Sequence, residues 1–311
     1  MSKRYQYEPD NFSEIIPYVE SEKETVVEKV CMSETLFFYD TCSLRYHAKL
    51  RDAESVFTFI KEHEGVVVIP RTIIMELSSS EETEAALLRN AEIRYLEKLN
   101  KKEIPIVIFD EEWAKDCLAY AHDENIGKRN NRIINVMKDF KNTFRSLQQC
   151  FQGKTNAEKS ELMGNLPVTR DLIQPLLREL RESKQEGDSL GEELIYLIIA
   201  LLADLGSQMY VFSDDRSSVF KYQKLREKMD NYGYENLKGQ VCTPAFATTM
   251  LQKGVITFEQ AKTLICSAHG NDQICKYTYR DGESFDVRMR NFTLEDVLEK
   301  MRNDAVFRIL H

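Results

Sequence analysis

Short apolar runs recur along the chain and alternate with longer amphipathic segments. The runs predict strands at 36–40, 65–70, 105–110, 209–214 and 240–246. The segments between them predict helices at 54–63, 71–99 and 191–206. Continuously apolar strands that alternate with helices are typical of a parallel sheet covered on both faces. The pattern therefore predicts an α/β fold.

The alternation stops between residues 111 and 185, where the pattern is helical only. The middle of this stretch, KRNNRIINVMKDFKNTFRSLQQ, is basic and amphipathic. Its apolar residues recur at helical spacing, at Ile133, Ile134, Met137, Phe140, Phe144 and Leu147. We expect 111–185 to be a large helical insertion into the α/β core.

The chain is expected to divide into three parts. Residues 1–34 form an N-terminal extension, 35–250 form the α/β domain with its insertion, and 251–311 form a small α+β extension. Within the last part, the pattern predicts a helix at 258–268, a polar hairpin, and a final helix starting near Thr293.

The composition of the chain restricts the class of protein and its cellular compartment. Seven cysteines are scattered without C-x-x-C spacing, so neither a zinc knuckle nor a disulfide framework is expected. No apolar run approaches the roughly 18 residues of a membrane span, and the first residues lack a secretory pattern. We therefore expect a cytoplasmic protein. The net charge of −9 disfavours a basic nucleic-acid-binding domain, but it is compatible with a carboxylate metal site.

Acidic residues stand where the predicted strands end. Asp40 ends the first strand, and Asp214 and Asp215 end the fourth. Glu76 lies on the helix after the second strand, and the glutamates at 192–193 open the helix that leads to the fourth. Ligands of parallel sheets bind at the carboxyl ends of the strands. Several carboxylates that share a pocket require a cation, and such oxygen ligands suit Mg²⁺ or Mn²⁺.

Each acid also has a structural interpretation. Asp40 could cap the next helix, and Glu76 could form a buried ion pair. The glutamates at 192–193 could be helix N-terminal acids favoured by the dipole, and the aspartates at 214–215 could form a turn. In these interpretations the partner of Glu76 is Arg71 or Arg89, and the partner of the aspartates at 214–215 is Arg216.

Four motifs, in their order along the chain, resemble those of PIN-domain nucleases. They are YDTCS at Asp40, PRTIIMEL with Glu76, SLGEELI at 189–195 and FSDDR at 212–216. The resemblance covers about 35–110 and 186–230, and it is to the VapC-toxin-like members of the family. It implies a Rossmann-like α/β/α sheet and a metal-dependent endoribonuclease.

The resemblance also implies which residues form the site. The implied catalytic and metal-binding residues are Asp40, Glu76, Glu192 or Glu193, Asp214 or Asp215, and Ser213 beside them. Asp215 fits the family's T-x-D element better than Asp214, with Ser213 in the threonine position. The ions would be Mg²⁺ or Mn²⁺.

The helical pattern ranks the two glutamates. Ile195, Ile198, Ile199 and Leu202 form one apolar stripe, and its backward extension reaches Glu192. Counting back from the small Ala200 favours Glu193 instead. The stripe favours Glu192, and both residues stay as candidates.

Basic residues in the insertion are candidates to bind nucleic acid. Between 121 and 155 there are seven Lys or Arg against three acids. The candidate contacts to the phosphate backbone are Lys128, Arg129, Arg132 and Lys138. A solvated helix face is the alternative interpretation.

The expected function is phosphodiester hydrolysis by a PIN-like nuclease, with RNA favoured over DNA, in a toxin, an antiviral effector or RNA processing. A non-catalytic scaffold or regulatory module and a 5′-nuclease-type DNase are the alternatives. A regulatory or inhibitory protein and a second copy of the chain are further candidate partners.

Overall fold

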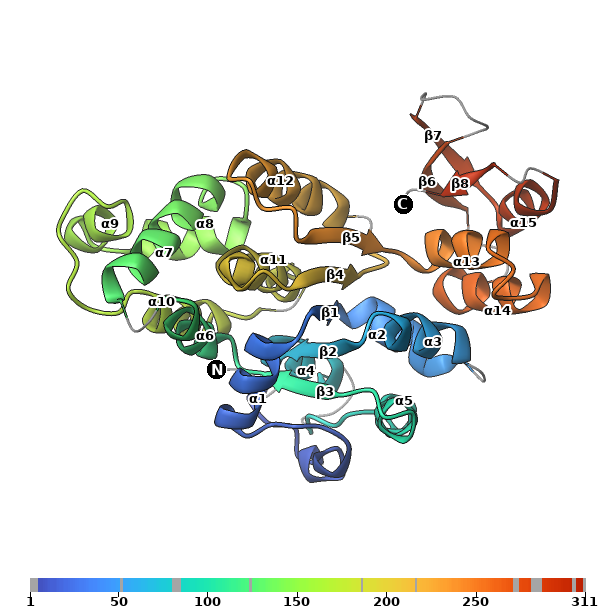
Figure 1. Ribbon diagram of the computed structural model, residues 1–311, viewed down its shortest axis with the longest axis horizontal. Coiled ribbons are helices and arrows are strands. Elements are labelled where there is room, and N and C mark those ends of the chain that lie inside the picture. The colour runs from blue at the N-terminus through green and yellow to red at the C-terminus, as the bar shows by residue number, and fades with distance from the viewer. Residues whose placement is uncertain are drawn as a thin grey trace.

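Five parallel strands form the central sheet of the computed structural model (Figure 1). The structure describes residues 5–50, 53–79, 85–122, 125–185, 187–215, 217–270, 274–280, 287–303 and 306–309. The strands run in the order β3-β2-β1-β4-β5. Their bounds are β1 (Thr35–Tyr39), β2 (Gly65–Pro70), β3 (Ile106–Phe109), β4 (Gln208–Phe212) and β5 (Leu237–Val241). The α/β prediction is confirmed.

The pairing of β1 with β4 brings distant acids together. The two strands run in register from Thr35 beside Gln208 to Tyr39 beside Phe212. Asp40 and Ser213 therefore follow the two strands at the same edge of the sheet. The first and fourth strands of the sheet are therefore neighbours.

Every residue of β1, β2 and β3 is buried, because helices cover both faces of the sheet. Figure 1 shows α1, α6 and α11 on one side and α2, α3 and α5 on the other. The helices around the sheet are α1 (Lys23–Met32), α2 (Thr41–Lys49), α3 (Glu54–Glu62), α4 (Arg71–Ser78), α5 (Asn90–Lys101), α11 (Leu190–Leu202) and α12 (Ser218–Asn231). Short 3₁₀ turns span Phe12–Glu14, Ile16–Tyr18, Glu111–Trp113 and Ala203–Leu205.

The helix predicted over 71–99 is two helices, α4 and α5. After α4, the hydroxyls of Ser78 and Ser79 bond back to the carbonyls of Met75 and Glu76, which competes with a further helical turn. The second helix starts afresh where the Glu92 carboxylate accepts from the backbone N–H of residue 89 at 2.9 Å.

The strand predicted over 240–246 is also shorter than expected. β5 ends at Val241, and helix α13 (Thr243–Gln252) begins two residues later. Pro244 lies in the first turn of this helix, where a fixed φ is favourable and the missing N–H has no helical partner to lose. The apolar run at this place therefore continues as a helix.

Between residues 111 and 185 the described residues form helices joined by turns and loops, with no strand. Its helices are α6 (Ala114–Ala121), α7 (Ile126–Phe140), α8 (Arg145–Gly153), α9 (Asn156–Leu162) and α10 (Ile173–Glu182). The six apolar residues predicted to share a face are all buried. They pack beside α11, which is buried along its whole length, as expected of a helix that is apolar on all sides.

A smaller α+β unit follows β5. It contains α13, α14 (Phe258–His269), α15 (Leu294–Asn303) and a second, antiparallel sheet in the order β7-β6-β8. The strands are β6 (Cys275–Arg280), β7 (Val287–Phe292) and β8 (Arg308–Ile309). The helix and hairpin predicted here are confirmed, whereas α13 and β8 were not expected. Among the described helices, none is both long and apolar enough to cross a membrane.

Candidate active site

Five acids line one cavity at the carboxyl edge of the parallel sheet, and four of them belong to the motifs singled out in the sequence. The cavity has a volume of about 280 Å³. Its acids include Asp40 after β1, Glu76 on α4, Glu192 on α11 and Asp215 after β4. The strand order places these segments side by side, although they lie up to 175 residues apart in the sequence.

Asp40 is buried at the junction of β1 and α2. Its carboxylate accepts hydrogen bonds from the N–H of Thr41 at 2.6 Å, from Cys42 Sγ at 2.8 Å and from Ser213 Oγ at 2.9 Å. Burial and the charge of Glu76 together raise the pKa of Asp40 to about 6, although these hydrogen bonds lower it. Asp40 therefore caps α2 and also presents a carboxylate to the cavity, so its structural and functional interpretations coexist.

Glu76 reaches the cavity from α4 over the first turn of α11. Its carboxylate accepts from the Thr41 hydroxyl and forms an ion pair with Lys184 Nζ at 3.0 Å. Gly191 permits this approach, because a Cβ at that position would lie 2.6 Å from Glu76 Oε1. The ion pair with Arg71 or Arg89 considered from the sequence is absent among the described contacts of Glu76.

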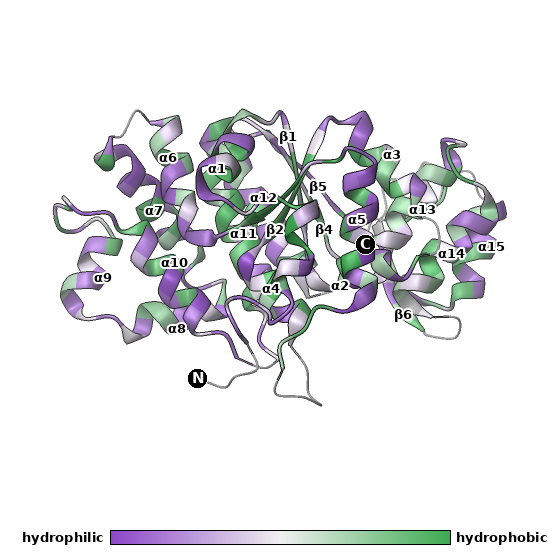
Figure 2. Ribbon diagram, turned by 90° about the horizontal axis from the view of Figure 1, so that it is seen from below, coloured by the Kyte–Doolittle hydropathy of each residue, from purple (hydrophilic) through white to green (hydrophobic). Residues whose placement is uncertain are grey.

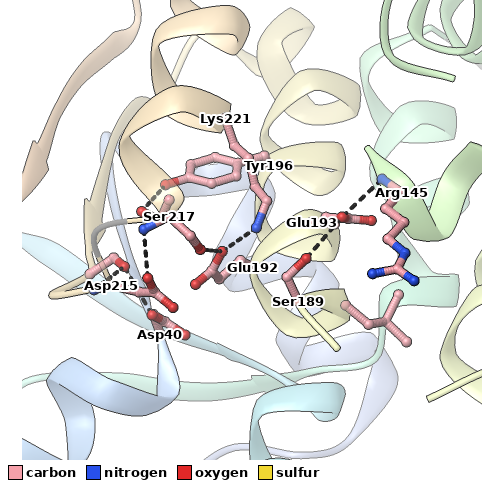
Figure 3. Close-up of polar contacts among 12 residues, drawn as sticks. Asp40, Arg145, Ser189, Glu192, Glu193, Tyr196, Asp215, Ser217 and Lys221 are labelled. Atoms are coloured by element: carbon pink, nitrogen blue, oxygen red, sulfur yellow. Dashed lines mark hydrogen bonds and ion pairs between the residues drawn. The ribbon is translucent and has the colours of Figure 1, made fainter. Parts of the chain in front are cut away.

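Glu192 and Asp215 both line this cavity (Figure 3). Glu192 forms an ion pair with Lys221 and accepts from Ser217 Oγ at 3.3 Å. Burial, the contact with Asp215 and the charge of Asp40 together raise the pKa of Glu192 to about 9, although the charge of Lys221 lowers it. Burial acts in the same direction on Asp215, but hydrogen bonds from Glu192 and Ser217 leave its pKa lowered.

Glu193 points away from this cavity toward the helical segment (Figure 3). Its carboxylate accepts from the N–H groups of Arg145 at 3.0 Å and Ser146 at 2.7 Å, and from Ser189 Oγ at 3.0 Å. These N–H groups open α8 and have no partner within that helix. Glu193 therefore acts as the N-terminal cap of α8.

Asp214 likewise has a structural position. Its carboxylate accepts a hydrogen bond from the Ser43 hydroxyl. It also accepts from the N–H and the hydroxyl of Thr243, both at 2.7 Å. These bonds tie the end of β4 to α2 and to the start of α13. Ser213 is buried between the neighbouring acids, because its hydroxyl donates to Asp40 and accepts from Asp215 N at 3.3 Å. Arg216 lies outside the described residues.

Two lysines at this cavity were not expected from the sequence. Lys184 and Lys221 are nearly buried and neutralise Glu76 and Glu192 from the loop after α10 and from α12. Lys184 also pairs with Asp188, four residues later, which was a readable signal of a local ion pair. Lys221 carries no comparable signal, because it meets its partner only through the packing of α12 on α11.

The donor set of the cavity fits a hard divalent ion in its chemistry. Carboxylates that raise one another's pKa in a buried cavity are the oxygen ligands that Mg²⁺ and Mn²⁺ take. Over the part of the chain that the structure describes, however, no three acidic, His or Cys side chains come close enough to enclose one ion. Lys184 and Lys221 hold Glu76 and Glu192 in their present positions, so an ion would compete with these lysines.

The four basic residues singled out on α7 differ in their surroundings. Lys128 and Lys138 are exposed and Arg129 is half-buried. Arg132 is buried, with its guanidinium bonded to the carbonyl of Ala200 and stacked 4.5 Å from the ring centre of Tyr234. Arg132 therefore joins α7 to α11 in the interior and is not placed to meet a phosphate group.

Comparison with known proteins gives one match, to the family model of the PIN domain over residues 38–161. The match contains Asp40 and Glu76 and ends in α9. Neither the curated proteins nor the solved structures compared with the chain gave a match. The matched segment contains the end of β1, all of β2 and β3, and two of the acids that line the cavity. Residues 38–161 of the chain therefore match the PIN domain, whose family members are generally nucleases.

Proposed function

We propose that the chain is a metal-dependent nuclease that hydrolyses phosphodiester bonds, with RNA as the favoured substrate. One observation carries the proposal: Asp40, Glu76, Glu192 and Asp215 come from four motifs and line a single cavity at the carboxyl edge of a PIN-domain sheet. Bound Mg²⁺ or Mn²⁺ would supply activation of water and stabilisation of the leaving oxygen.

The residues of the cavity have distinct proposed roles. Asp40 and Asp215 are the proposed direct ligands. The Ser213 hydroxyl links the Asp40 carboxylate to the backbone N–H of Asp215, which supports their positions at the cavity. Glu76 and Glu192 are proposed to hold the ion or its bound water. For this, the ion pair of Glu76 with Lys184 and that of Glu192 with Lys221 would have to break. The Thr41 hydroxyl keeps the Glu76 carboxylate turned toward the cavity.

Exposed cations on α7 are proposed to assist substrate binding. Lys128 and Lys138 are accessible to solvent, and Arg129 is partly so. Their support is the local excess of base in a chain of net charge −9. Arg132 is left out of this proposed surface because of its buried contacts.

A non-catalytic PIN module is a second candidate, and a specific observation favours it. Lys184 and Lys221 already neutralise two of the four acids, so the cavity is internally compensated without an ion. A module of this kind would use the acids to hold its own fold together. Cleavage assays separate the two candidates.

Cleavage should require a divalent ion. We expect the purified protein to cut end-labelled single-stranded RNA in Mn²⁺ or Mg²⁺, to lose this activity in EDTA, and to regain it when excess Mn²⁺ is restored. Plasmid and single-stranded DNA in parallel reactions test the preference for RNA over DNA. Cleavage that continues undiminished in EDTA would contradict the metal-dependent assignment, and no cleavage of either substrate would favour the non-catalytic module.

A further inference from the structure

The small C-terminal sheet carries an unusual concentration of positive charge. Its strands β6, β7 and β8 contain five basic residues and no acid, in a chain whose net charge is −9. The basic residues are Lys276, Arg280, Arg288, Arg290 and Arg308. We call these five residues, on the three strands, the basic sheet.

One face of this sheet is apolar and buried. Tyr277, Tyr279 and Phe292 are buried there, and the ring centre of Phe292 lies 4.9 Å from that of Tyr279. Cross-strand partners share a face of a sheet. Lys276 is paired with Asn291 and Arg280 with Arg308, and these positions alternate with the buried tyrosines, so they belong to the opposite face.

The edge strand β7 and part of the opposite face are open to solvent. On the opposite face, Lys276 and Met289 are exposed and Arg280 is half-buried. Arg288 and Arg290 are paired with Tyr279 and Tyr277, so they extend from the tyrosine side of β7, and both are exposed. Among the described residues, no carboxylate forms an ion pair with Lys276, Arg280, Arg288 or Arg290. Hydrogen bonds from Thr293 lower the pKa of Asp296, and the charge of Arg290 makes a further, smaller contribution.

The connection between β6 and β7 contains the nearby acids Asp281, Glu283 and Asp286 in the sequence. These residues lie outside the described part of the chain. They number three, against the five basic residues of the strands. The sheet as a whole therefore keeps an excess of positive charge.

The basic sheet stands next to the carboxyl edge where the cavity opens. Helix α13 connects the two: Thr243 at its start bonds to Asp214, and Gln252 at its end donates to the carbonyl of Phe307 at 2.5 Å. Burial raises the pKa of Tyr277 on β6, and the charge of Asp214 contributes to the rise. Figure 2 shows β6 on the same lower side of the molecule as α2 and α4, which supply Asp40 and Glu76.

We propose that the basic sheet binds the phosphate backbone of the nucleic-acid strand whose cleavage is proposed for the cavity. The inference rests on the proposed function for its ligand, and on charge complementarity for the contact. The aromatic rings of the sheet are buried, so stacking with bases has no platform there. Binding is therefore independent of base sequence, and the sheet holds a strand without reading it.

The test measures binding apart from cleavage. The probe is a fluorescein-labelled single-stranded RNA of mixed sequence, titrated with the full chain in EDTA at several salt concentrations. The variant Lys276→Gln/Arg280→Gln/Arg288→Gln should bind more than about 10-fold more weakly at low salt. Its slope of log affinity against log salt should fall by about 2, since each phosphate contact on a single strand contributes about 0.7.

A matched control removes the same charge elsewhere. Lys61, Lys101 and Lys102 are exposed at the C-terminal ends of α3 and α5, which lead toward the amino ends of β2 and β3. They are thus at the opposite edge of the parallel sheet from the cavity. Their triple replacement by Gln should leave the affinity and the salt slope unchanged.

Several outcomes would overturn the proposal. Equal affinity and slope in the sheet variant and the wild type would remove the basic sheet from binding. Attachment to vesicles of phosphatidylserine and phosphatidylcholine without any RNA binding would assign the sheet to a membrane surface instead. If the triple variant fails to fold by circular dichroism, Lys276→Gln alone should lower the slope by about 0.7, and an unchanged slope there is equally decisive.

Failure of the proposed nuclease activity gives a different result. RNA that binds in EDTA with the expected salt slope but is never cut in Mn²⁺ contradicts the nuclease and leaves the basic sheet in place. RNA that is cut normally by a sheet variant with normal binding contradicts the basic sheet alone.

Discussion

Asp40→Asn should lower Mn²⁺-dependent cleavage of RNA by about 100-fold or more, because it removes a proposed direct ligand of the ion. The substitution keeps the size of the side chain and an oxygen that can accept from the Thr41 N–H. Single-turnover cleavage of an end-labelled RNA, with enzyme in excess, measures the change without interference from product release. Cleavage within a few-fold of wild type would exclude Asp40 as a ligand.

The same variant should be at least as stable as the wild type in metal-free buffer. Burial raises the pKa of Asp40 from 3.8 to about 6, with the Glu76 charge acting in the same direction. Between these two pH values the folded protein holds a proton that the unfolded chain has released. The free energy of unfolding therefore falls as pH rises through this window, and the full penalty is present above it.

Asn carries no charge, so the variant avoids this penalty. Its stability advantage should be absent near the lower end of the window, grow as pH rises, and level off at about 1 to 3 kcal/mol. Urea unfolding in EDTA at a series of pH values measures the difference. A variant destabilised by more than about 2 kcal/mol across the series would instead assign Asp40 chiefly to capping α2.

Glu192→Gln should cost far more activity than Glu193→Gln, although the two residues are adjacent. Glu192 lines the cavity beside Asp215, whereas Glu193 accepts from two N–H groups that open α8. We expect a loss of about 100-fold for the first variant and of a few-fold at most for the second, in single-turnover assays at equal folded concentration.

Stability should rank these variants in the opposite order. Glu193→Gln weakens a charged cap and should lower the free energy of unfolding by about 1 kcal/mol. Glu192→Gln removes a carboxyl group whose pKa is raised to about 9, so the loss of its charge in metal-free buffer costs less. Each variant is thus the matched control of the other. The reverse order of activities would assign the third acid to Glu193.

The sequence was sufficient for the sheet because its strands are buried on both faces. Runs such as GVVVIP allow few other structures, and their alternation with helices predicts parallel pairing. The 240–246 run was ambiguous, because an apolar stretch of this length suits a strand or a buried helix. Pro244 was the residue that could have resolved it, as a first-turn proline of α13.

The candidate site was predictable in part for a related reason. Acids at the ends of parallel strands must meet at one edge, and this brings Asp40, Glu76, Glu192 and Asp215 to a common cavity. The direction of each side chain depends on packing between distant segments. Glu193 turns toward α8 because the backbone N–H groups of Arg145 and Ser146, which have no partner within that helix, lie there. These donors are 48 and 47 residues away in the sequence, so no local pattern encodes the contact.

Arg132 illustrates the same limit for the basic helix. From the sequence it is one of several cations on an amphipathic segment, equivalent to Lys128 and Lys138. Its interior position depends on Tyr234 and Ala200, which lie on other elements and cover its guanidinium. Net local charge therefore overstated the surface available to a phosphate backbone.

Binding of Mn²⁺ to the intact protein is the most direct measurement of whether the cavity is a metal centre. Isothermal titration of the metal-free wild type, Asp40→Asn, Glu192→Gln and Glu193→Gln should be performed under identical conditions. We predict saturable binding to the wild type and to Glu193→Gln, with binding lost or strongly weakened in the other two. Equal binding by all four proteins, or none by the wild type, would contradict a metal site formed by Asp40, Glu76, Glu192 and Asp215.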